Sequence, residues 1–312
     1  MIPKNPKNDN IIINEEKFQS HKLMTNDVII KLDRVNFKRE SDLVRGCGSY
    51  LKFSHQQHQQ TKEKRNKLKE ANFCKFRFCP MCSWRRTRNI TGQLLEALEA
   101  VEAKISVSYL FLTLTTQNPQ INDLKATVKH LNDSFQRLSQ TKGYKNAVLG
   151  HFKGLELLGD NTPTGEAHPH FHILLIVQKS YFTSRDYISQ AKWTKMWGKA
   201  LRADYTPIVH IQAIKQKKNS KLTRLQSAVL EVAKYAVKHT ELTTRTDDDF
   251  RAIINQTKRM RFFSTSGILK EKINLLKADD DLINFKEKTE ALWLEIEEVF
   301  YEWRDGNYFL KK

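Results

Sequence analysis

A run of ten residues with three alternating histidines constrains the fold of this chain more than any other segment. The run reads His168-Pro-His-Phe-His-Ile-Leu-Leu-Ile-Val177. A β-strand repeats every two residues, so its three histidines share one face while Phe171 and Ile173 point to the other. The apolar stretch 173–177 that follows is typical of a strand buried on both faces. We therefore expect 168–177 to be a central strand of a sheet.

This strand also predicts a metal site. Imidazoles at positions i and i+2, here His170 and His172, can hold one divalent ion from a rigid sheet. Glu156 lies in a preceding expected strand over 148–158, and an antiparallel pair can bring its carboxylate to the same face. Two histidines and a carboxylate suit Mg²⁺ or Mn²⁺, which keep positions for water and a phosphate oxygen. A solvated face without a metal is the alternative, and a ligand role for His168 stays open.

The remaining pattern predicts an α+β domain built on a central antiparallel sheet with flanking helices. Further strands are expected at 106–115 and 208–214, and helices at 86–102, 121–140, 184–202 and 225–239. The polar stretch 55–65 predicts an exposed loop, and the apolar spacing over 284–303 predicts an amphipathic helix. We divide the chain into an N-terminal extension of uncertain order (1–40), a cysteine-rich element (41–100), the sheet domain (101–245) and a helical C-terminal region (246–312).

Charge favours a nucleic-acid partner. Lys and Arg number 53 against 35 Asp and Glu, which gives a formal net charge of +18. Such an excess attracts polyanions, of which nucleic acid is the most common. The cations expected to contact DNA are Arg77, Arg85, Arg86, Lys215, Lys217 and Lys218, although charge runs are more often solvated faces.

The sequence favours neither a membrane-spanning segment nor an export signal. The polar start MIPKNPKNDN does not resemble a signal peptide, and no apolar run approaches the roughly 18 residues of a membrane helix. We therefore expect a cytoplasmic protein without a membrane partner, in which cysteines stay reduced.

The four cysteines predict a structural zinc site. Cys79 and Cys82 form a Cys-x2-Cys half-site, and Cys47 with Cys74 supplies a looser second half. Four thiolates are enough for one tetrahedral zinc ion. His55 or His58 could replace one thiol, and buried free cysteines are the alternative.

The expected helix over 225–239 carries a second candidate site. Glu231, Tyr235 and Lys238 follow one another at spacings of four and three, so they lie along one helical face. A phenol has a pKa near 10 and becomes a useful nucleophile only when a metal or a base assists it. Lys238 could stabilise a phosphate as a point charge. An ordinary surface tyrosine beside a solvated lysine is the alternative.

Together these motifs resemble a known enzyme family. His170-Phe-His172 resembles the His-hydrophobic-His motif of the HUH endonucleases, Tyr235-Ala-Val-Lys238 resembles their Tyr-x-x-Lys motif, and Phe111–Thr115 looks like the strand that precedes both. The order is that of the single-tyrosine rolling-circle replication initiators (Rep proteins) of Gram-positive plasmids. The resemblance extends over roughly 43–270, including the cysteine segment 73–86 and Trp193-x-x-x-Trp197.

The resemblance implies an activity. Tyr235 would nick the double-strand origin of a plasmid and stay bound to the 5′ phosphate, leaving a 3′-hydroxyl primer, and Glu231 would later activate water for the terminating cleavage. It also implies host helicase and DNA polymerase as partners, makes the C-terminal region 246–312 a candidate for origin binding, and leaves a homodimer open. A transposase or relaxase sharing this chemistry is one competing interpretation. A non-enzymatic zinc-containing repressor is another, but it leaves the histidines and Tyr235 without a role.

Overall fold

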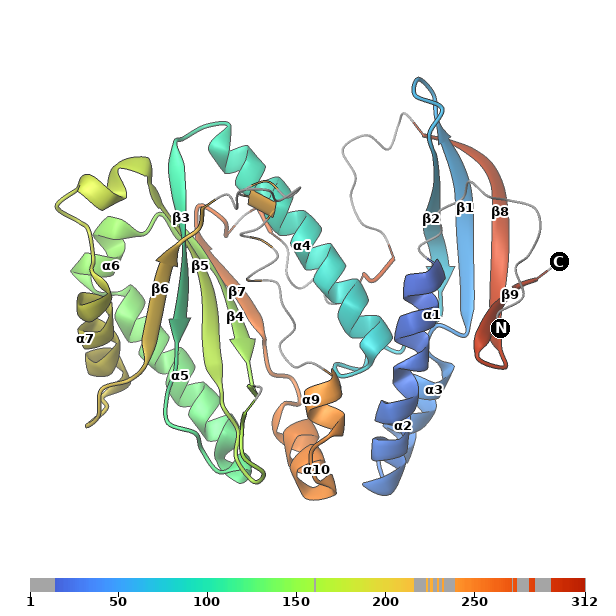
Figure 1. Cartoon of the computed structure of the whole chain (residues 1–312), viewed down its shortest axis with the longest axis horizontal. Helices are drawn as coiled ribbons and strands as arrows, with labels where there is room; N and C mark the ends of the chain where they lie inside the picture. Colours follow the sequence, from blue (N-terminus) through green and yellow to red (C-terminus); the bar gives the residue numbers. More distant parts are fainter. Residues whose placement is uncertain are drawn as a thin grey trace. The chain divides into compact units, whose positions relative to one another are not determined.

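The chain folds into two compact units (Figure 1). The computed structural model describes residues 15–159, 161–215, 223, 225–226, 229, 232, 239–270, 272–273, 281–283 and 293–311. The first unit draws on Met1–Arg86 and Asp279–Lys312, and the second on Thr87–Ala278. The N-terminal and C-terminal regions therefore share a unit with the cysteine-rich segment. The sequence analysis divides the chain into consecutive regions and does not predict this grouping.

The second unit is built on a five-stranded sheet. Its strand order is β6-β3-β5-β4-β7, and each neighbouring pair is antiparallel. The strands are β3 (Val107–Leu114), β4 (Gly150–Glu156), β5 (His170–Gln178), β6 (Val209–Ala213) and β7 (Phe263–Gly267). The histidine strand β5 is central, as the sequence predicts, and the expected α+β class is confirmed. The sequence analysis missed β7, a short strand with no apolar alternation.

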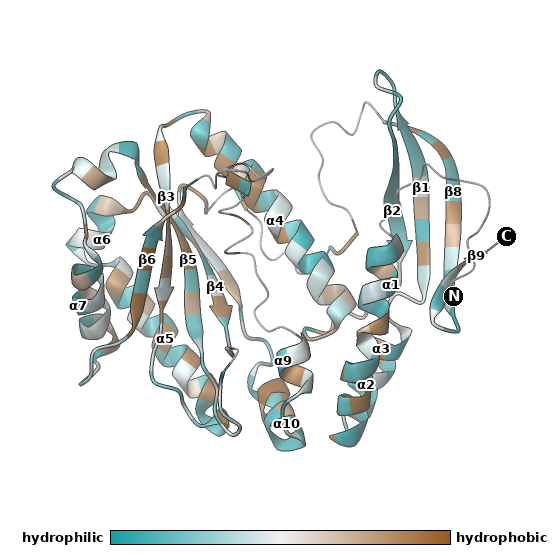
Figure 2. Ribbon diagram, viewed as in Figure 1, coloured by the Kyte–Doolittle hydropathy of each residue, from teal (hydrophilic) through white to brown (hydrophobic). Residues whose placement is uncertain are grey.

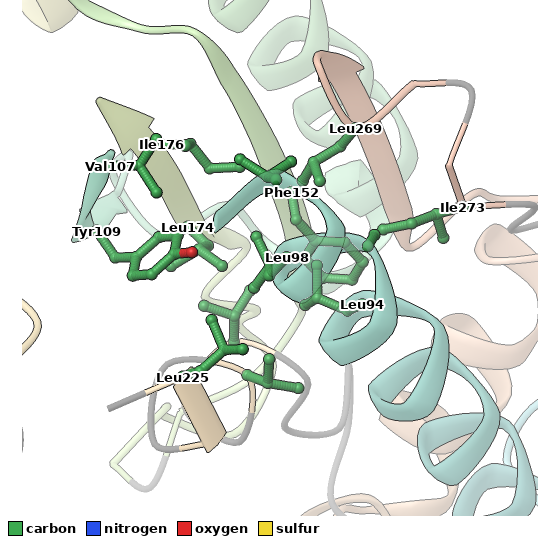
Figure 3. Packing of buried hydrophobic residues seen from close by; sticks show 14 of the residues in the cluster. Leu94, Leu98, Val107, Tyr109, Phe152, Leu174, Ile176, Leu225, Leu269 and Ile273 are labelled. Atoms are coloured by element: carbon green, nitrogen blue, oxygen red, sulfur yellow. The ribbon is translucent and has the colours of Figure 1, made fainter. Parts of the chain in front are cut away.

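Helices cover both faces of this sheet. One face packs against α5 (Leu124–Ser139), whose Phe135 ring lies 5.8 Å from that of Phe171 on β5. The other face packs against α4 (Pro80–Glu102), which supplies Leu94 and Leu98 to a core shared with β4 and β5 (Figure 3). The remaining elements with described bounds in this unit are η1 (Ile121–Asp123), α6 (Lys142–Ala147), η2 (Lys179–Thr183), α7 (Gln190–Leu201), α9 (His239–Thr243) and α10 (Asp247–Gln256).

The first unit combines three helices with a second antiparallel sheet of order β2-β1-β8-β9. Its elements are α1 (Glu15–Leu23), α2 (Thr25–Arg34), α3 (Lys38–Gly46), β1 (Tyr50–His58), β2 (Lys64–Ala71), β8 (Trp293–Arg304) and β9 (Asn307–Lys311). The prediction of an exposed loop at 55–65 is wrong, because β1 and β2 form a hairpin there. Figure 2 shows why the sequence hides it, since β2 is hydrophilic for most of its length.

The amphipathic helix expected over 284–303 is also wrong where the structure describes it. Residues 293–304 form β8, which pairs with β1 from Trp293 opposite His58 to Glu302 opposite Tyr50. Leu294 and Ile296, which a helix would bury, are 57% and 55% exposed. Backbone pairing with β1 outweighs the helical spacing of this segment, since tertiary partners routinely override local propensity. Within the described residues, every helix is too short or too polar to cross a membrane.

Candidate active site

Strand register brings Glu156 and two histidines together. Glu156 lies opposite His170, and Gly154 lies opposite His172, in the β4–β5 pair. The Nε2 atom of His172 is 2.9 Å from Glu156 Oε2, and that of His170 is 3.4 Å away. The two Nε2 atoms are 3.0 Å apart. Ligands at right angles and about 2.1 Å from an ion lie about 3.0 Å from each other, so these three atoms could hold one ion.

Outer contacts orient both imidazoles. His170 Nδ1 donates to the backbone oxygen of His168 at 2.7 Å, which directs its Nε2 toward Glu156 and His172. His172 Nδ1 lies 3.2 Å from the hydroxyl of Thr113, directly opposite on β3. Phe111 stacks on the His172 ring with centroids 5.3 Å apart. Such outer contacts hold metal ligands in place. The sequence analysis missed Thr113, whose only signal was its position in the expected strand 106–115.

The carboxylate in this group is ionised. Burial raises the pKa of Glu156, but hydrogen bonds with His170 and His172 outweigh this effect and lower the pKa to about 2. His168 is not part of this group of close ligand atoms, and its Nδ1 lies 2.7 Å from the side-chain oxygen of Asn118. The charge and donor set of Glu156, His170 and His172 fit a divalent cation with open positions for substrate oxygen.

The described residues of the expected tyrosine helix include three that pack on the same face of the sheet. Tyr235, Glu231 and Lys238 themselves lie outside the described residues. Val229 and Val232 are buried with Phe152, Leu174 and Ile176, in the core that also holds Leu225 (Figure 3). On β5, Leu174 and Ile176 alternate onto the face of His170 and His172.

A glycine allows this close approach. The backbone oxygen of Val232 lies 3.4 Å from the point that a Cβ atom on Gly154 would occupy. Gly154 is the residue opposite His172. The chain therefore passes over the sheet next to a candidate metal ligand, three positions before Tyr235 in sequence.

The four cysteines converge in the first unit. Cys82 Sγ lies 3.5 Å from Cys47 Sγ and 3.7 Å from Cys74 Sγ, and all four sulfurs, including that of Cys79, lie within 4.8 Å of one another. Sulfurs about 2.3 Å from a tetrahedral zinc ion are about 3.8 Å apart, so the cluster has the spacing of such a site. All four are free thiols. Hydrogen bonding by Cys47 lowers the pKa of the Cys74 thiol.

A buried lysine lies against this cluster. Lys22 of α1 is 4% exposed and donates to the backbone oxygens of Arg45 at 2.8 Å and Cys47 at 2.7 Å. Burial lowers the pKa of Lys22, and negative charge on Cys47, Cys79 and Cys74 opposes that effect. Four thiolates around a divalent ion carry a net charge of −2, which a nearby ammonium offsets. The region expected to be an extension of uncertain order thus supplies a cation to the cluster.

Two of the cations expected to contact DNA are structural instead. Arg85 is 4% exposed, and its Nε donates to the backbone oxygen of Leu282 at 2.8 Å. Arg86 is 6% exposed and donates to the backbone oxygens of Lys75 and Phe76. Their placement on a DNA-contacting surface is therefore wrong, because their guanidinium groups satisfy buried carbonyls.

The other expected cations are placed differently. Arg77 is half-buried, and Lys215, just beyond β6, is exposed. Lys217 and Lys218 lie outside the described residues.

Comparison with known proteins finds similar replication proteins. Residues 65–309 match a family described as "Replication protein". The chain is 33% identical over 297 residues to a "Protein rep" of Bacillus amyloliquefaciens, covering 88% of this chain and 86% of the relative. It is 35% identical over 295 residues to a "Protein rep" of Lactiplantibacillus plantarum, covering 88% and 89%. A "Protein rep" of Staphylococcus aureus is 33% identical over 249 residues, 79% of this chain and 99% of the relative. No solved structure matches the chain.

Proposed function

This chain belongs to the replication protein (Rep) family, and from that premise we propose that it starts rolling-circle plasmid replication by nicking one strand of the origin. One observation carries the proposal. The group of Glu156, His170 and His172 lies on the sheet face that Val232, just before Tyr235, also covers. A metal-binding group and a nearby phenol are the two parts that tyrosine-dependent phosphodiester cleavage requires.

The proposed chemistry conserves the energy of the phosphodiester bond. Mg²⁺ or Mn²⁺ held by Glu156, His170 and His172 would polarise the scissile phosphate. The Tyr235 oxygen attacks phosphorus and loses its proton, and the bond from phosphorus to the 3′ oxygen breaks. The 3′ oxygen takes up a proton and becomes the primer end, while the 5′ phosphate stays on Tyr235. Lys238 stabilises the transferred phosphate as a point charge.

Termination requires a second cleavage, for which we assign Glu231 as the general base that activates water. The residue lies one helical turn before Tyr235 in sequence, on the same predicted helical face. Hydrolysis would leave an enzyme unable to transfer the strand again, which limits each molecule to one round.

Replacing Glu231 with alanine should separate the two cleavages. Nicking of supercoiled plasmid should stay within a few-fold of wild type, whereas release at the end of a round should fall by roughly 100-fold, the scale of a lost general base. A replication assay should then show single-stranded products longer than one plasmid unit. Glu96→Ala, an exposed glutamate on α4, is the matched control and should terminate normally. Equal loss of nicking and termination in Glu231→Ala would contradict this division.

The cysteine cluster is proposed to hold a structural zinc ion that stabilises the first unit. Because the four sulfurs come from the end of α3, the segment before α4 and α4 itself, one ion would join these elements. On the basis of their charge, we also propose that Arg77, Lys215, Lys217 and Lys218 contact DNA.

Replacing Lys22 with methionine should weaken zinc binding by about 10- to 100-fold, as loss of an outer contact to a metal site commonly does. Methionine keeps most of the apolar volume but removes the ammonium beside Cys47. Competition with a chromogenic chelator measures the change. Lys17→Met alters an exposed lysine of the same helix and should have no effect. Equal zinc retention in the two variants would show that Lys22 does not compensate the thiolate charge.

The proposed partners follow from the reaction. Origin DNA is the substrate, in duplex form for recognition and single-stranded at the cleavage point. A host helicase would unwind the duplex, and a DNA polymerase would extend the 3′ end. Such a cycle takes place in the cytoplasm, and a homodimer is compatible with it.

A cleavage assay tests the function directly. Purified protein with Mn²⁺ or Mg²⁺ should convert supercoiled plasmid carrying its origin to the nicked form, and should form a denaturation-resistant adduct with a single-stranded origin oligonucleotide. Protein that binds origin DNA but gives neither product with either ion would support a binding role alone.

A further inference from the structure

A basic groove lies on the second unit between α5 and α10. Its volume is about 1300 Å³. Lysines of α5 and cations of α10 and the turn after it line the groove, against one acidic residue, Asp248. The cationic lining residues are Lys125, Lys129, Arg251, Lys258 and Arg259. None of them belongs to the metal groups or to the cations expected to contact DNA.

The two walls of the groove are fixed to each other. The Gln256 side chain accepts from the backbone nitrogen of Lys125 at 2.8 Å and donates to the backbone oxygen of Ile121 at 2.6 Å. Apolar residues of both helices, among them Val128 and Ile253, are buried beneath the walls. The groove is therefore preformed, and binding there would cost little conformational entropy.

The groove lies at the end of the sheet that carries the candidate active site. Arg245 and Asp249 bind the backbone of Pro163 and Gly165, in the connection that runs from Glu156 to His170. The turn after α10 leads into β7, and Phe262 accepts from the backbone nitrogen of Leu155, next to Glu156.

Two of the groove cations form exposed ion pairs, and a third, Lys258, donates to Asn255 at 3.0 Å. Arg251 pairs with Asp248 at 2.9 Å and Lys129 with Asp133 at 2.9 Å, but both pairs are exposed, and such pairs contribute little. A buried cation lies behind the wall: Lys153 donates to Asn132, a lining residue, at 2.6 Å. Burial lowers the pKa of Lys153 to about 8, so the amine is mostly charged near neutral pH.

The composition of the groove points to a backbone ligand. Cations spread over two helices and a turn match a repeating anion better than a single phosphate group. Among the described residues that line the groove, none has an aromatic side chain on which an unpaired base could stack. Phosphate contacts position a duplex without reading its sequence.

We propose that the groove between α5 and α10 holds the sugar–phosphate backbone of duplex DNA beside the cleavage point, without reading its bases. The inference rests on the proposed nicking function and adds to it a positioning surface on the side of α5. Duplex held there would lie close to the strand ends that carry Glu156 and His170.

The test compares two triple variants with the same loss of charge. The groove variant is Lys125→Ala, Lys129→Ala, Arg259→Ala, and the control variant is Lys192→Ala, Lys195→Ala, Lys199→Ala on the exposed side of α7. Fluorescence anisotropy with labelled duplexes, one of origin sequence and one unrelated, gives affinity as a function of salt concentration. Each lost phosphate contact lowers the slope of log affinity against log salt by about 0.9.

For the groove variant, the magnitude of this slope should fall by about 2 to 3, and the affinity should fall at least about 10-fold. Both changes should be equal for the two duplexes. The control variant should keep the wild-type slope. Equal slopes in the two variants would overturn the proposal, and so would a loss confined to the origin duplex, because that pattern indicates base reading.

Adduct formation on a short single-stranded origin oligonucleotide separates this proposal from the nicking function. Such a substrate needs only the active site, so the groove variant should form the adduct at the wild-type rate. Wild-type protein that forms no adduct would remove the nicking function, whereas the salt slopes alone decide whether the groove binds duplex. A groove variant that loses the adduct on this short strand would contradict a role confined to duplex positioning.

Discussion

Replacing Tyr235 with phenylalanine is expected to abolish both the nick and the covalent protein–DNA adduct. The substitution keeps the aromatic ring and removes only the hydroxyl oxygen that would attack phosphorus. Since that oxygen forms the new bond, no residual transfer through this position is possible, and the loss should exceed about 1000-fold. The assay is cleavage of supercoiled plasmid with Mn²⁺, together with gel detection of an adduct to an oligonucleotide labelled at its 3′ end. That end belongs to the fragment that stays on the protein.

The matched control is Tyr187→Phe, which removes the hydroxyl of an exposed tyrosine in the same unit and should cleave at the wild-type rate. Duplex affinity of Tyr235→Phe should also match wild type, because the variant alters chemistry and leaves the basic groove intact. An adduct formed by Tyr235→Phe would mean that another residue is the nucleophile, and peptide mapping of that adduct would identify it.

The sequence predicts much of the second unit because its strands carry strong local signals. Residues 107–114 and 170–178 are mostly apolar, whereas 150–156 is a more polar part of the strand expected over 148–158, and all three are strands of the central sheet. Alternation alone placed His170 and His172 on one face, and the hairpin argument brought Glu156 to them. The contact of Thr113 with His172 depends on which strand pairs with β5, and spacing within one strand contains no information about its neighbours.

The first unit escaped prediction because polar cross-strand contacts hold much of its sheet. Lys52 pairs with Glu298 at 2.8 Å and Lys69 with Glu295 at 2.8 Å, so charged residues occupy positions where apolar alternation would be the usual signal. The partners lie more than 200 residues apart in sequence. A separation of 197 residues likewise hides the role of Arg85, whose guanidinium binds the backbone of Leu282. A cation beside a cysteine motif looks like a DNA contact until its long-range partner is known.

Substitutions around the candidate metal centre should produce a graded loss of nicking. His172→Ala removes one of three ligands and leaves the Glu156 carboxylate without its partner at 2.9 Å, so activity should fall by at least about 100-fold. Thr113→Val keeps the shape of the side chain but removes the hydroxyl next to His172 Nδ1, and should lose about 10-fold. Plasmid nicking measured over a range of Mn²⁺ concentrations compares the variants.

The dependence on Mn²⁺ distinguishes metal binding from a general disturbance of β5. If His172 and Thr113 act through the ion, Thr113→Val should need more Mn²⁺ for half-maximal nicking yet approach the wild-type rate at saturation, because its three ligands remain. His168→Ala supplies the matched control. It alters a histidine of the same run that binds Asn118 instead of the metal group, and it should leave the Mn²⁺ dependence unchanged. A shift for His168→Ala as large as that for His172→Ala would show that the loss reflects the strand and not the ion, and it would remove the metal assignment on which the proposed cleavage depends.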